Sequence, residues 1–222
     1  MLDFFAKKKK PLDAARLYFQ KGRYDKAEKL CVDELNKNEN NAEALKVLSE
    51  IYRRTRNDKK FRDIALKLAN IYLSERNVNS SLVLLRSVLK REPNDIEIHK
   101  KLLDIYKTAD MPDQLMDALF KLGDIYIKNE LTTEATNTFM ELLEINKKNK
   151  SLDICFKIID RFQVLDNRLM ITAAVREGIN VAKEQNNIEG FNRLIDVASK
   201  YDCDIGENIK FTIDYFKKNK DK

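Results

Sequence analysis

Small side chains recur at a fixed spacing along the chain. Pairs of small residues twelve positions apart begin at positions 15, 69, 123 and 178, so that successive pairs are separated by 54, 54 and 55 residues. The pairs are Ala15 and Ala27, Ala69 and Ser81, Gly123 and Ala135, and Gly178 and Gly190. Small residues at two fixed points let adjacent antiparallel helices cross at close range, and self-similarity at a fixed period is typical of a solenoid.

Apolar residues recur three and four positions apart almost throughout the chain, which is helical periodicity. Leu45, Leu48, Ile51 and Tyr52 are one example. Five glycines and three prolines in 222 residues leave little turn chemistry for a sheet fold. Short polar clusters divide the apolar pattern into about twelve segments. We therefore predict an all-α protein, a right-handed α-solenoid of about twelve antiparallel helices.

Two further elements repeat with the small residues. A tyrosine follows three residues after the first small residue at Tyr18, Tyr72 and Tyr126. Segments ending in an aromatic residue recur at 48–52, 102–106, 158–162 and 212–216. The chain is thus interpreted as four units of three helices, near residues 8–61, 62–115, 116–170 and 171–222, in one solenoid over residues 11–216.

The first two helices of each unit resemble the tetratricopeptide repeat, a 34-residue helix-turn-helix with small residues and a tyrosine at set positions. The matching residues are Ala15, Tyr18, Gly22, Tyr24 and Ala27, then Ala69, Tyr72, Ser81 and Pro93, then Leu122, Gly123, Tyr126, Ala135 and Phe139. The fourth unit keeps Gly178 and Gly190 but has Val181 in place of the tyrosine. The third helix of each unit departs from the family. It makes either a third layer or, as we favour, half of a degenerate repeat.

Residues able to support catalysis or to hold a cofactor or metal are scarce. His99 is the single histidine, and we expect it at a helix surface or boundary. Cys31, Cys155 and Cys203 lack the paired spacing of a metal or redox site, so we expect reduced, packed thiols. No glycine-rich phosphate loop occurs. We therefore predict a protein that is not an enzyme and has no cofactor. The chain has 20 asparagines, which we attribute to coding bias.

One connection between helices is strongly basic in the first unit alone. It contains Arg53, Arg54, Arg56, Lys59, Lys60 and Arg62, opposed only by Asp58. A solvated helix–helix turn and a patch for an acidic partner or nucleic acid are both open. The resemblance also implies a clamp for two carboxylates in some members of the family. No unit here has both the lysine and the asparagine of that clamp, and Glu50 would repel a carboxylate.

The N-terminal segment 1–10 combines Leu2, Phe4 and Phe5 with four lysines. It is interpreted as a frayed tail, as a partner-docking segment or as a contact with an anionic membrane surface. Residues 1–10 and the C-terminal tail 217–222 each carry +3 of the net charge of +6. Residues 11–216 are therefore neutral overall, which favours protein partners over nucleic acid.

The resemblance implies a scaffold or adaptor that binds a peptide or helix of another protein. By analogy with bacterial proteins of this class, we expect a motility, secretion or envelope assembly as its setting. The alternative is a helical repeat protein that binds nucleic acid through the Arg53–Arg62 turn. No apolar run reaches the 18 residues of a membrane span, and the N-terminal lysines follow the apolar residues, so we expect a cytoplasmic location.

Overall fold

The structure is a computed structural model that describes residues 10–206. Eleven α-helices and no strand occur in this range, which confirms the predicted all-α class. They are α2 (Pro11–Gln20), α3 (Tyr24–Lys37), α4 (Ala42–Thr55), α5 (Asp58–Ser74), α6 (Val78–Leu89), α7 (Ile96–Thr108), α8 (Pro112–Lys128), α9 (Thr132–Asn149), α10 (Leu152–Val164), α11 (Arg168–Glu184) and α12 (Ile188–Lys200). The predictions for Phe4, Phe5, the recurring segment 212–216 and the tail 217–222 concern residues outside the described range.

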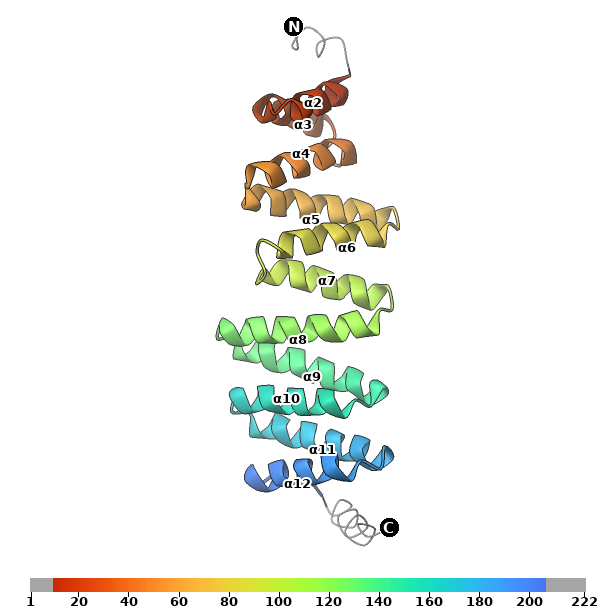
Figure 1. Ribbon diagram of the computed structural model, residues 1–222, viewed down its shortest axis with the longest axis vertical. Coiled ribbons are helices and arrows are strands. Elements are labelled where there is room, and N and C mark those ends of the chain that lie inside the picture. Colours follow the sequence, from red (N-terminus) through yellow and green to blue (C-terminus); the bar gives the residue numbers. More distant parts are fainter. Residues whose placement is uncertain (1–9, 207–222) are drawn as a thin grey trace. The chain divides into compact units, whose positions relative to one another are not determined.

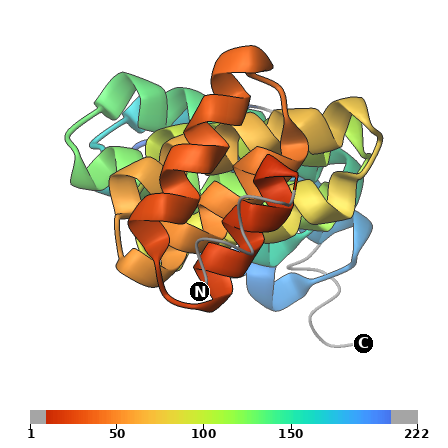
Figure 2. The same ribbon diagram turned by 90° about the horizontal axis from the view of Figure 1, so that it is seen from above.

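The helices belong to two compact units, divided along the chain between Met111 and Pro112. The first unit contains α2–α7 and the second contains α8–α12. Within each unit consecutive helices run antiparallel and lie side by side in chain order (Figures 1 and 2). The third helix of a predicted unit continues this stack, because α4 packs on α3 and α5, and α10 packs on α9 and α11. Such nearest-neighbour packing is typical of α-solenoids.

Asparagine begins many of the helices. The side-chain oxygens of Asn41, Asn57, Asn77, Asn167 and Asn187 each accept a hydrogen bond from the backbone N–H three residues later. Asp95 and Ser151 do the same for α7 and α10. An N-cap of this kind stabilises a helix by about 1 kcal/mol relative to alanine. Attributing the asparagines to coding bias alone was therefore wrong, because five of them cap helices.

A left-handed residue follows the last turn of most helices. Arg56, Arg76 and Glu130 have φ values of 56°, 59° and 59°, where glycine is the usual residue. The next backbone N–H then donates to the carbonyl of an aromatic residue five positions earlier. These bonds run from Asn57 to Tyr52, Asn77 to Tyr72, Met111 to Tyr106, Leu131 to Tyr126 and Asn167 to Phe162. The aromatic residues of both recurring sequence elements therefore have the same role. Each lies in the final turn of a helix, and its carbonyl accepts the hydrogen bond that closes the tight connection to the next helix.

The small residues of the repeat lie where helices touch. Ala15, Ala27, Ala69, Ser81 and Ala135 have no exposed surface. A methyl group on Gly123 of α8 would lie 2.4 Å from the Phe139 ring of α9, and one on Gly178 would lie 3.0 Å from Leu194 of α12. The crossings predicted from the 54-residue spacing are thus close contacts between neighbouring helices.

Two smaller expectations differ from the structure. His99 is buried and not at the surface. Its Nε2 donates a hydrogen bond to the Pro93 carbonyl at 2.8 Å, which fixes the loop before α7. Cys31 and Cys155 are buried, as expected of packed thiols, but Cys203 lies after α12 and is partly exposed. Within residues 10–206, no helix has the length and apolar character needed to cross a bilayer.

Candidate functional site

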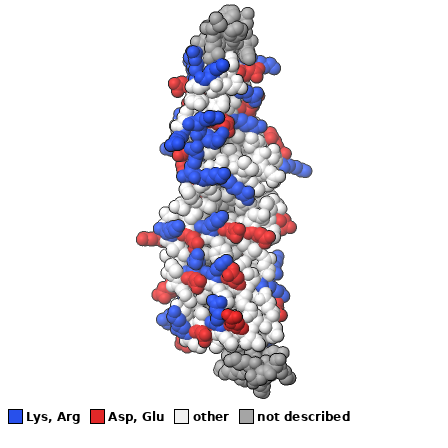
Figure 3. All heavy atoms as spheres, in the orientation of Figure 1, with Lys and Arg blue, Asp and Glu red and all other residues white. Residues whose placement is uncertain are grey.

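The six basic residues singled out from the sequence surround the turn between α4 and α5. Arg53 and Arg54 belong to the last turn of α4, Arg56 is the left-handed residue after it, and the other three lie in the first turns of α5. In Figure 3, Lys and Arg side chains gather over the part of the first unit built by α4, α5 and α6. The local sequence produces this arrangement because Asn57 caps α5 directly after the turn.

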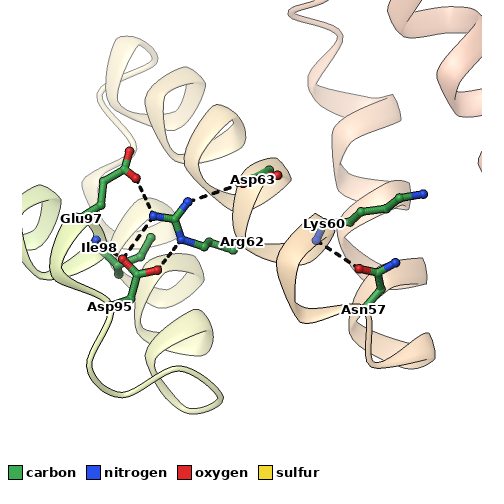
Figure 4. A network of polar contacts seen from close by, with 7 residues as sticks. All are labelled: Asn57, Lys60, Arg62, Asp63, Asp95, Glu97 and Ile98. Atoms are coloured by element: carbon green, nitrogen blue, oxygen red, sulfur yellow. Dashed lines mark hydrogen bonds and ion pairs between the residues drawn. The ribbon is translucent and has the colours of Figure 1, made fainter.

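Half of these basic residues are engaged in ion pairs. Arg53 pairs with Glu50 at 2.5 Å, and Lys60 pairs with Glu28 at 2.9 Å while lying over the Tyr52 ring. Arg62 has three acidic neighbours, Asp63, Asp95 and Glu97, and Figure 4 shows its guanidinium directed at all three. Lys60 thus joins α5 to α3, and Arg62 joins α5 to α7, whereas the ion pair of Arg53 lies within α4. All three basic residues carry little uncompensated charge.

The other half have no ion pair within residues 10–206. Arg54, Arg56 and Lys59 are exposed, and their side chains make no contact with a carboxylate of the described residues. The free positive charge of the turn is thus three residues and not six. Only the structure separates the paired from the unpaired basic residues, because the acidic partners of the paired ones lie up to 35 residues away in the sequence.

Arg91 is a residue of this region that sequence reasoning missed. Its guanidinium donates to the Arg53 carbonyl at 2.9 Å, pairs with Asp58 and lies 5.7 Å from the centre of the Phe61 ring. Asp58, the acid expected to oppose the basic turn, is therefore paired with Arg91, in the connection that follows α6. No local signal predicts this contact, because 38 residues separate Arg91 from Arg53.

A groove of about 540 Å³ opens beside this turn, bordered by α4, α5 and α6. It is larger than two other hollows of the same unit, of about 380 and 440 Å³. Both α4 and α6 pack on α5, whose Phe61 and Leu68 are 2% exposed and line the groove. These two side chains close the floor of the groove, and the apolar surface open to a ligand comes from the exposed Val83 and the half-buried Tyr72 and Leu84.

The borders of the groove have different chemistry. On α4 lie Lys46, Ser49, Glu50 and Arg53, and on α6 lie Asn79, Ser80, Val83, Leu84 and Ser87. The Lys46 ammonium sits 5.3 Å from the centre of the Tyr72 ring, which also lines the groove. Val83 is 69% exposed. The α6 border also offers hydroxyl and amide groups for hydrogen bonds.

Two ionisable groups of the first unit have a pKa that burial raises. Burial raises the pKa of the Cys31 thiol to about 12, with Glu28 and Glu34 adding to the effect. A thiol of this kind is a poor nucleophile at neutral pH. Burial and the hydrogen bond to Glu28 raise the pKa of the Tyr52 hydroxyl. Among the described residues, no three His, Cys, Asp or Glu side chains are placed to share a metal ion.

Two protein-family models match the chain. The model described as the ARM repeat of tetratricopeptide repeat protein 21 matches residues 26–115, which contain the groove, and the tetratricopeptide repeat model matches residues 117–149. Together they span more than half of the chain. The chain belongs to the tetratricopeptide repeat family. The second match covers α8 and α9, where the sequence carries the family's small and aromatic residues at Gly123, Tyr126, Ala135 and Phe139.

Three solved structures are similar to this chain over most of its length. The apo form of RapI is 15% identical, with a TM-score of 0.39 over 95% of this chain and 83% of RapI. The kinesin light chain repeats of Podosopora anserina are 15% identical, with a TM-score of 0.38 over 80% and 95%. YrrB, a TPR protein with an unusual peptide-binding site, is 15% identical, with a TM-score of 0.28 over 86% and 90%. Among curated proteins, a search finds no match to the chain.

Proposed function

We propose that this tetratricopeptide repeat protein is a non-enzymatic scaffold that binds a peptide or helix of another protein in the groove bordered by α4, α5 and α6. One observation carries the proposal: buried Phe61 and Leu68 line an open groove of about 540 Å³ beside exposed Val83. Stacked helical repeats create extended binding surfaces and are typically non-catalytic. A setting in a motility, secretion or envelope assembly is part of the proposal.

Site-specific photocrosslinking in the native cell tests this function. Benzoylphenylalanine replaces Ser80 in the groove or, as the control, Lys67, an exposed residue of α5 that does not line it. We expect a crosslinked partner from position 80 and not from position 67. Val83→Arg in the position-80 variant should remove that adduct. Equal adducts from both positions, or an adduct that survives Val83→Arg, would contradict the proposed groove.

Nucleic-acid binding through the α4–α5 turn is the second candidate function. It is supported by the three basic residues without an ion pair, Arg54, Arg56 and Lys59. If all three contact phosphates of duplex DNA, the logarithm of affinity should fall with the logarithm of salt concentration with a slope of about −3. The triple substitution to serine should abolish this binding. Absence of binding to RNA and DNA at low salt would eliminate the function.

A further inference from the structure

Lys46 supplies a positive charge at one end of the groove. Its ammonium lies over the Tyr72 ring, and no carboxylate of the described residues pairs with it. Glu50, the acid expected to repel a carboxylate ligand, is bound by Arg53 at 2.5 Å. Because this pair is neutral as a whole, Lys46 leaves the lining of the groove with a net positive charge.

Additional positive charge lies past the other end of the α4 border. Arg53 lines the groove there, and the unpaired Arg54, Arg56 and Lys59 follow it around the turn. Arg91, beside the same end, is neutralised by Asp58. A surface with positive charge at both ends attracts an anionic ligand and disfavours a basic one.

Between these two ends Phe61, Leu68 and Val83 give the groove a largely apolar lining, with serines along its borders. Val83 stands on α6 between Ser80, on the side of Tyr72, and Ser87, on the side of Phe61. Its side chain is 69% exposed, whereas Phe61 and Leu68 are buried beside it. An apolar side chain of a partner placed here would remove the Val83 surface from water.

We infer that the groove binds an extended acidic segment of a partner protein, with an apolar side chain between its carboxylates. This inference rests on the proposed function and names the chemistry of the bound segment. Lys46 on α4 and Arg56 just after its end are ten positions apart, about 15 Å at a helical rise of 1.5 Å per residue. An extended chain covers this length in about five residues, at roughly 3.3 Å each. The segment therefore has one carboxylate for Lys46, an apolar side chain for Val83 and further carboxylates about five positions after the first.

Fluorescence polarisation with the full-length protein tests this inference. The probe is a labelled decapeptide of glycine and serine that carries one glutamate, a leucine after it, and a glutamate pair starting five positions after the first. We expect saturable binding that weakens with added salt. Lys46→Gln should weaken binding about threefold, the size of a rim ion pair. Val83→Ser should weaken it about tenfold through lost apolar contact.

Matched variants separate these effects from general damage. Lys67→Gln removes an exposed lysine outside the groove, and Val164→Ser removes a 66% exposed valine of the second unit. Both should bind the probe like the unaltered protein, and circular dichroism should show all four variants folded.

Several results would overturn the inference. They are a dissociation constant weaker than about 1 mM, equal binding of a peptide with lysines in place of the glutamates, and equal effects of groove and control variants. Displacement of the probe by a single-stranded oligonucleotide more effectively than by unlabelled peptide would show that the positive charges of the groove bind nucleic acid. If photocrosslinking from position 80 captures a partner through a segment without acidic residues, the scaffold function stands and the acidic specificity fails.

Discussion

Arg62 on α5 holds Asp95, the residue that caps α7, across 33 positions of sequence. The guanidinium hydrogen-bonds both oxygens of the Asp95 carboxylate, and the same carboxylate accepts the backbone N–H of Ile98 at 2.9 Å (Figure 4). The side chain of Asp95 is only 7% exposed. One carboxylate therefore starts a helix and also ties that helix to another, which explains why Arg62 is better placed to stabilise the first unit than to bind a ligand.

Replacement of Asp95 by asparagine should keep the cap and lose the ion pair, because asparagine is an equally good N-cap. We expect Asp95→Asn to lower the free energy of unfolding at pH 7 by about 1–2 kcal/mol, measured by urea denaturation. Asp153→Asn is the control, since its pair with Lys157 is exposed and should contribute less than about 0.5 kcal/mol.

The same substitution has a predicted pH dependence. Burial would raise the pKa of the Asp95 carboxyl, but hydrogen bonds from Arg62 and the Ile98 N–H outweigh it and hold the pKa below its ordinary value. Its stabilising contribution is thus complete above about pH 4, where the unfolded carboxyl is ionised, and is lost as the pH falls through the lower folded pKa. The gap between the unaltered protein and Asp95→Asn should shrink in acid. A gap that is the same at pH 3 and pH 7 would refute this account.

Ser81 occupies a buried repeat position without using its hydroxyl. Its Oγ has no hydrogen-bond partner in the described part of the chain, whereas the corresponding positions of two other units are alanines, Ala27 and Ala135. Ser81→Ala should raise the free energy of unfolding by about 1 kcal/mol, because it removes an unsatisfied polar group. Ser74→Ala, which removes an exposed hydroxyl, should change it little. Destabilisation by Ser81→Ala would show that the hydroxyl has a role.

Gly123 is required by the Phe139 ring. A Cβ at this position would lie 2.4 Å from the ring, and the ring is held between Phe120 and Phe162 at centroid distances of 6.1 and 6.2 Å. Alanine gains about 1 kcal/mol of helix propensity, but overpacking in a full core costs more. Gly123→Ala should therefore lower the melting temperature, with a net loss of about 1–2 kcal/mol. Gly178→Ala, facing a flexible leucine, should be closer to neutral; equal effects would contradict the explanation.

The three thiols should differ in reactivity. Burial raises the pKa of both Cys31 and Cys155 to about 12, while Cys203 is partly exposed. Because the thiolate is the reactive form, iodoacetamide at pH 8 should modify Cys203 alone in the folded protein and all three cysteines in denaturant. Intact-mass spectrometry counts the adducts. Rapid addition of two or three groups to the folded protein would show that a buried thiol is accessible.

Local patterns in the sequence were sufficient to predict the helices and the contact positions of the repeat. The polar clusters mark the helix connections because a helix ends where its apolar stripe stops, and the small residues at 15, 27, 69 and 135 recur where helices touch. The asparagine caps were also readable, since asparagine before an apolar run is an N-cap signal. The 54-residue super-period and the handedness of the solenoid remain predictions.

The candidate site was decided by tertiary structure. The sequence by itself determined an all-α chain of tetratricopeptide repeats with a basic α4–α5 connection, because helical periodicity and repeat spacing depend on residues close together in the chain. It did not distinguish Arg62, paired with Asp95, from the unpaired Arg54, and it gave no sign of Arg91 or of the groove beside Val83. The pairs of Arg62 with Asp95 and of Arg91 with Asp58 each join residues 33 positions apart, and the groove is lined by three helices. Only the packing of those helices brings these side chains together.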